Sequence, residues 1–137
     1  MTGIRHGGKD LKNVIISSIV IAALLVSWRF FLFYAENECQ QMIHSIEHDI
    51  IPSIESEQWK DAKDYLKKTN EKWHHFRKLG LYFFHTETIN TIDYNLARAL
   101  EYANAEDISN TAGELNSIAE QLSFLTENEK LSLQNIF

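Results

Sequence analysis

The sequence predicts an all-α protein, in which one N-terminal transmembrane helix is followed by an antiparallel bundle of about four helices. Three observations support this prediction. The 22 residues from Val14 to Ala35 include 18 apolar ones. Residues 36–137 contain no valine, one proline and two glycines, which argues against a sheet. Apolar residues there recur every three or four positions, the period of a helix buried along one side.

The N-terminal apolar run is long enough to cross a bilayer, since a spanning helix needs about 20 such residues. Arg5, Lys9 and Lys12 precede it, and acidic residues follow it. The positive-inside rule therefore predicts a cytoplasmic N-terminus (1–12), a transmembrane signal anchor (13–35) and an extracytoplasmic helical domain (36–137). We expect a single-pass protein of the cell membrane. Cleavage after Ala35 is the alternative, but it would require a small residue where Phe33 stands.

Four amphipathic stripes define the helices of the outer domain. The first continues from the span, and Pro52 should kink it or mark its weak end. Gly80 should end the second helix, and Thr86 should N-cap the third. Residues 104–107 should form the turn before the fourth. The stripes consist of Cys39, Met42, Ile43, Ile46, Ile50 and Ile54; Trp59, Ala62, Leu66, Thr69, Trp73 and Phe76; Ile89, Ile92, Leu96, Ala99, Leu100 and Ala103; and Ile108, Ala112, Leu115, Ile118, Ala119, Leu122 and Leu125.

The large residues of the middle stripes are the predicted structural core. Their spacing is that of side chains facing the other helices of a bundle. The two tryptophans could instead line a ligand pocket, although their heptad-like spacing favours a core role. The predicted core residues are Trp59, Leu66, Trp73, Ile89, Ile92 and Leu96.

Charge and cysteine content exclude several classes of protein. The chain has a net charge of −6, and residues 36–137 carry 9 basic against 18 acidic residues, so a nucleic-acid partner is not expected. Cys39 is the single cysteine, which excludes a disulfide-stapled domain and a zinc finger. It should be a packed free thiol, or else cross-link two copies. No Gly-rich phosphate loop and no G-x-S-x-G motif occurs, so we expect no catalytic residues, no cofactor and no enzyme.

One histidine motif has a link to metal chemistry. His44 to His48 reads H-x-x-E-H, and two histidines four residues apart share one face of a helix. Zinc peptidases with this motif need a third ligand and a much larger fold. We therefore predict no metal site, with His44 and His48 as weak candidates and an exposed polar pair as the simpler interpretation.

The connection at Leu79–His85 is too apolar for an ordinary loop. Its aromatic residues Tyr82, Phe83 and Phe84 fit either of two roles. They could form an exposed patch that docks onto a membrane protein or onto lipid headgroups, because aromatic residues left at a surface often anchor interfaces. They could instead close one end of the bundle core.

The outer part also resembles a known family. The pattern W-K-D-A-K-x-x-L, a second tryptophan, a histidine before I-x-x-I-D-x-x-L-A-R and a terminal N-I-F are similar to domain-of-unknown-function family 4363, signal-anchored helical proteins of spore-forming Gram-positive bacteria. The resemblance covers nearly the whole chain, and it implies a multipass membrane protein as partner. The matching positions are Trp59, Ala62, Leu66, Trp73, His85, Ile89, Ile92, Leu96, Arg98, Asn135 and Phe137.

Together these features predict a membrane-anchored interaction or scaffold protein that binds or regulates a membrane partner. Its expected partners are the lipid bilayer, a multipass membrane protein and a second copy of the chain. The alternative is a ligand- or metal-sensing helical module that acts through a partner. A sensor should contain a polar-lined cavity, whereas a scaffold should have a dry core and an exposed apolar patch.

Overall fold

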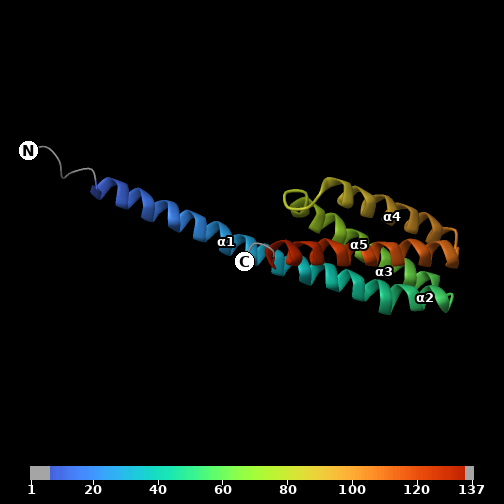
Figure 1. Ribbon diagram of the computed structural model, residues 1–137. Coiled ribbons are helices and arrows are strands. Elements are labelled where there is room, and N and C mark those ends of the chain that lie inside the picture. Colours follow the sequence, from blue (N-terminus) through green and yellow to red (C-terminus); the bar gives the residue numbers. More distant parts are fainter. Residues whose placement is uncertain (1–6, 135–137) are drawn as a thin grey trace, which may run out of the picture. The chain divides into compact units, whose positions relative to one another are not determined.

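The computed structural model describes the backbone of residues 7–134 and the side chains of residues 8–127. Its elements are α1 (Gly7–His44), a π-helical turn η1 (Ser45–Ile50), α2 (Ile51–Glu55), α3 (Trp59–Gly80), α4 (Thr86–Asn104) and α5 (Ile108–Gln134), and the described part holds no strand (Figure 1). The chain divides into two compact units, Met1–Tyr34 and Ala35–Phe137. The predicted all-α class is confirmed.

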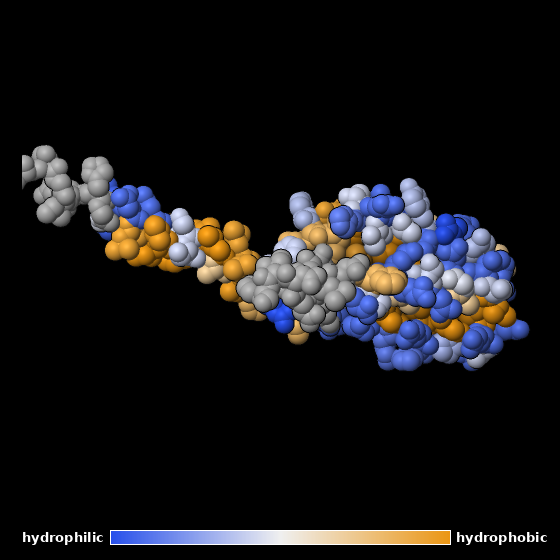
Figure 2. Space-filling model, viewed as in Figure 1, coloured by the Kyte–Doolittle hydropathy of each residue, from blue (hydrophilic) through white to orange (hydrophobic). Residues whose placement is uncertain are grey.

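The described part of the first unit is the N-terminal part of α1, and most of its apolar surface is exposed. Every side chain from Gly8 to Ser27 is exposed, although most of them are aliphatic. Figure 2 shows the resulting hydrophobic surface along this part of the helix. A helix that is apolar on all sides is typical of a membrane span. By length and composition, this is one helix near the N-terminus that could cross a membrane.

The second unit is an antiparallel helical bundle, as the stripes predict. α3 lies between η1–α2 and α4, while α5 lies between α4 and η1–α2, so the helices close into a ring. One apolar stripe from each helix faces the centre and is shielded from water. The largest fully buried side chains are Met42, Ile46, Ile50, Ile54, Leu66, Trp73, Phe76, Ile89, Ile92, Leu96, Leu115 and Ile118.

Pro52 interrupts the first helix of the bundle less than the sequence suggests. Proline has no N–H, so the usual bond to the carbonyl four residues earlier is absent. The chain forms the π-helical turn η1 just before it, in which the Ile51 N–H reaches the Ile46 carbonyl. The helical path then continues to Glu55, with Pro52 in the first turn of α2, where its missing donor costs least.

Short links join the remaining helices. Glu57 and Glu106 adopt positive φ angles of 56° and 58° just after α2 and α4, so each chain reversal takes only a few residues. Asp107 caps α5 by accepting the Asn110 N–H at 3.0 Å. Thr86 does not cap α4 as predicted: the N-cap residue is His85, and Thr86 is already the first helical residue.

Candidate functional site

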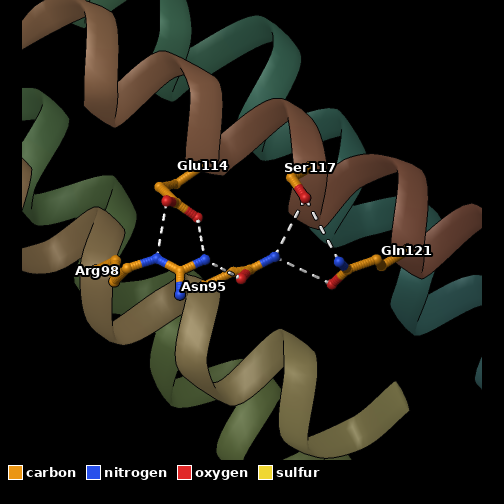
Figure 3. Close-up of polar contacts among 5 residues, drawn as sticks. All are labelled: Asn95, Arg98, Glu114, Ser117 and Gln121. Atoms are coloured by element: carbon orange, nitrogen blue, oxygen red, sulfur yellow. Dashed lines mark hydrogen bonds and ion pairs between the residues drawn. The ribbon is translucent and has the colours of Figure 1, made fainter. Parts of the chain in front are cut away.

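Among the described residues, a cluster of five polar side chains lies between α4 and α5 (Figure 3). Asn95 is 4% exposed, and its amide nitrogen donates to Ser117 Oγ at 3.2 Å and to Gln121 Oε1 at 3.3 Å. Arg98 Nη2 donates to Asn95 Oδ1 at 2.6 Å. The same guanidinium makes a two-pronged contact with Glu114, at 2.8 Å from Nε and 3.0 Å from Nη2.

This cluster is built to hold two helices in register. Asn95 lies on the apolar stripe of α4, so its amide needs partners to offset its burial. It finds them only when Ser117 and Gln121 of α5 face it, and a shift of α5 by one turn would leave it unpaired. The hydrogen bond to Glu114 raises the pKa of Arg98 above its ordinary value. These groups saturate one another, which favours a structural role over a catalytic one.

A second polar contact joins α3 to α4. The buried Trp73 indole donates from Nε1 to Asp93 Oδ1 at 2.6 Å. Arg77 Nη2 lies 2.9 Å from the other carboxylate oxygen of Asp93. Asp93 therefore binds both residues of α3, and it fixes the position of the Trp73 ring along the axis of the bundle.

The H-x-x-E-H motif lies on α1 and η1. The His44 and His48 rings meet edge to face, with their centres 4.4 Å apart, and both side chains are exposed. Among the described residues, no group of three or more His, Cys, Asp or Glu side chains is arranged to hold a metal ion. The pair alone offers two ligands, fewer than structural or catalytic zinc sites use.

Beside His44 runs an open groove of about 600 Å³ between the first helix of the bundle and α3. Lys72 lies at its edge, where it hydrogen-bonds Gln41 and pairs with Glu38 at 3.8 Å. Thr69 donates to Ser45 across the groove at 3.3 Å. Its lining is of mixed charge, from Gln40, Gln41, His44, Ser45, Asp49, Lys68, Thr69 and Lys72.

The predicted core residues fall into two groups. Leu66, Trp73, Ile89, Ile92 and Leu96 are all buried. Trp59 is only partly buried, because it is the first residue of α3 and lies at the open end of the bundle. On α5, Thr111 is buried and bonds the Asp107 carbonyl, whereas the expected stripe residue Ile108 is 38% exposed.

The three aromatic residues of the connection differ in their exposure to solvent. Phe84 is buried, with its ring centre 6.1 Å from that of Phe76, so the expectation that it belongs to an exposed docking patch is corrected. Phe83 is half-buried. Tyr82 is 82% exposed, and it is the residue of the three that reaches into solvent.

Cys39 is a packed free thiol. It is fully buried in the second unit, and burial, with a smaller effect of the Glu38 charge, raises its pKa to about 12. A disulfide between two copies would require this part of the bundle to open. The predicted family positions Asn135 and Phe137 lie outside the described residues.

The fold and these contacts define a class: an all-α protein in which an uncovered apolar helix precedes a helical bundle with a hydrogen-bonded interior. Residues 29–136 match the family described as Domain of unknown function (DUF4363), and the chain belongs to that family. No curated protein matches the chain, and neither does any solved structure.

Asn95, Ser117 and Gln121 were not predicted as functional or structural residues from the sequence. A signal was present, since Asn95 occupies a stripe position between Ile92 and Leu96 where an apolar residue is expected. Its partners could not be read from the sequence, because they depend on how far α5 is shifted along α4.

Proposed function

We propose that this chain is a non-catalytic, single-pass membrane protein whose extracytoplasmic bundle is held at the membrane surface and acts by contact with a membrane partner. The observation that carries the proposal is the contrast within the helical path from Gly8 to Glu55. Its N-terminal part exposes aliphatic side chains on all sides, while its C-terminal part hides one stripe inside the bundle. Water cannot stabilise the first part, but a bilayer can.

The orientation follows from charge. Lys9 and Lys12 lie beside the N-terminal end of the apolar run, and Glu36 and Glu38 lie beyond its other end. Basic residues next to a span are retained on the cytoplasmic side. The N-terminus is therefore cytoplasmic, the bundle is extracytoplasmic, and the span is an uncleaved signal anchor.

One face of the span is suited to a neighbouring transmembrane helix. Val26, Arg29, Phe30 and Phe33 follow the i, i+3, i+4, i+7 pattern and surround a shallow hollow of about 280 Å³. Phe30 and Phe33 are each at least 70% exposed. An arginine near the end of a span commonly has a functional partner. The rings of Phe30 and Phe33 lie beside Arg29 and offer apolar surface for contact with a neighbouring helix. A multipass protein or a second copy could supply the helix.

Photo-cross-linking from within the span tests this proposal. A benzoylphenylalanine at Phe33 in native membranes should give one discrete protein adduct, identified by mass spectrometry. Leu24 is the matched control, because it is 65% exposed and lies on the opposite face of α1. An adduct of equal yield from both positions, or lipid adducts alone, would contradict a specific partner on this face.

The groove beside η1 favours the second candidate function, a ligand- or metal-sensing module. Lys68 and Lys72 place positive charge beside the groove, and His44 adds the ring nitrogens of an imidazole. A sensor would bind a small anion or a metal ion there and signal through its partner. Thermal unfolding in the presence of Zn²⁺ or inorganic phosphate decides: a midpoint that rises in the protein but not in His44→Ala would support sensing.

A further inference from the structure

Hydrogen bonds fix which end of the bundle holds the aromatic connection. Thr69 of α3 bonds Ser45 of η1, and the two helices run in opposite directions. Gly80 lies eleven residues beyond Thr69, about 16 Å along α3, and Ala35 lies ten residues before Ser45, about 15 Å along α1. The connection 81–85 therefore lies level with Ala35, at the end of the bundle where the chain continues into the apolar run (Figure 1).

The connection is an ordered turn, and its backbone hydrogen bonds determine which side chains face the solvent. The N–H groups of Phe83 and Phe84 both donate to the Gly80 carbonyl, at 3.0 and 2.8 Å, and that of Tyr82 donates to Leu79 at 3.1 Å. This tight turn directs Phe84 into the core. It leaves Leu79, Leu81 and Tyr82 outside, exposed by 42%, 41% and 82%.

The charge around this turn is opposite to that of the domain as a whole. Residues 72–86 include Lys72, Arg77 and Lys78 and no acidic residue, whereas residues 36–137 have twice as many acidic as basic residues. Glu38 pairs with Lys72 and Asp93 pairs with Arg77, while Glu87 follows in the first turn of α4. Lys78, next to Leu79, is exposed.

We propose that Leu79, Leu81 and Tyr82 insert into the headgroup layer of the bilayer that α1 spans, as a second attachment point of the bundle. This rests on the membrane anchoring proposed above. Tyrosine favours the boundary between headgroups and acyl chains, because its ring is apolar and its hydroxyl reaches water. Lys78 attracts the phosphates of anionic lipids. Two attachment points restrict the tilt of the bundle and fix which of its faces a partner meets.

Depth measurements on the full chain test this inference. The chain, carrying Cys39→Ala, is reconstituted in vesicles of phosphatidylcholine and phosphatidylglycerol with a nitroxide label on Tyr82→Cys. We expect oxygen, which concentrates in lipid, to reach the label, and a water-soluble nickel chelate to be excluded severalfold more strongly than from Tyr94→Cys. Tyr94 is the matched control, an exposed tyrosine on α4 (66%). Equal access of the chelate to both labels would overturn the inference.

Two further variants test whether the bilayer itself shields the label. Leu79→Ser combined with Leu81→Ser should return the label at position 82 to water, while Tyr94→Ser should leave it shielded; no difference between them would count against insertion. Shielding that disappears when the protein is diluted in lipid would assign the patch to a second copy instead. Flotation of the vesicles after a carbonate wash reports separately whether α1 anchors the chain. If the chain stays with the vesicles but the label at position 82 is accessible to the chelate, the insertion of the connection is overturned and the anchoring by α1 is not.

Discussion

The N-terminal part of α1 and the helices of the bundle use similar aliphatic residues with opposite results. Between Val14 and Val26 these residues surround the helix and all are exposed, whereas on α4 they form one stripe, Ile89, Ile92 and Leu96, which is fully shielded. The difference lies in the arrangement around the helix axis rather than in the residue types. A stripe can be buried by neighbouring helices of the same chain, while a helix that is apolar all round needs a bilayer.

The largest effect should come from the bundle core. Trp73→Ala removes a fully buried ring and its bond to Asp93, so it should cost about 3–5 kcal/mol. Trp59→Ala should cost much less, because Trp59 is only partly buried. Thermal unfolding of the full chain in detergent, followed by circular dichroism, measures both. Equal losses would show that the two tryptophans do not differ as the structure requires.

A charge in the span should come next. Val20→Arg places a guanidinium near the middle of the apolar run, at a cost to insertion of about 2.5–3.5 kcal/mol. The fraction of protein that resists carbonate extraction should fall accordingly. Ala97→Arg, at an exposed position of α4, is the control and should remain in the membrane fraction. If Val20→Arg inserted as well as the control, the span would lie elsewhere.

The α4–α5 register contact should have a moderate effect. Asn95→Ala removes the side-chain hydrogen bonds of Asn95 to Ser117, Gln121 and Arg98, at a cost of about 1–3 kcal/mol. Asn90→Ala, on the exposed face of the same helix, should be nearly neutral. A double-mutant cycle with Gln121→Ala should show that the two losses of stability are not additive. Strict additivity would mean that Asn95 and Gln121 are not energetically coupled.

The smallest effect at neutral pH concerns Cys39. The folded thiol has its pKa raised from 9.0 to about 12, so the folded state holds its proton over a range in which the unfolded state loses it. Stability from this group is complete below pH 9 and decreases as the pH rises from 9 to 12. The unfolding midpoint of the protein should therefore drop more steeply over that range than that of Cys39→Ala. Parallel curves would contradict the burial of the thiol.

The helices and most of the core could be predicted from sequence, because both depend on local periodicity. Trp73, Ile89 and Leu96 lie in the interior since each belongs to a stripe of its own helix. Trp59 shows the limit of that reasoning: its spacing fits the stripe, but spacing does not reveal that the bundle ends there. Phe84 shows another limit, since hydrogen bonds to the Gly80 carbonyl, and not its neighbours in sequence, direct it inward.

The polar contacts were beyond sequence reasoning for a different reason. The bonds from Asn95 to Gln121 and from Trp73 to Asp93 join residues on different helices, and they exist only for one relative shift of those helices. The π-helical turn was likewise hidden. Pro52 indicates a break in the helical hydrogen-bond pattern. The sequence alone does not predict whether the helix kinks, ends or forms a wider turn there.

We propose above that the apolar part of α1 crosses a bilayer. Single cysteines placed from Lys9 to Glu38 in the Cys39→Ala chain are tested in vesicles for access of a water-soluble thiol reagent. A spanning helix predicts one continuous protected stretch centred near Leu24, with no helical periodicity, flanked by accessible positions at both ends. Protection that instead recurs every three or four residues would mean that one face is covered while the other meets water, and it would contradict the claim.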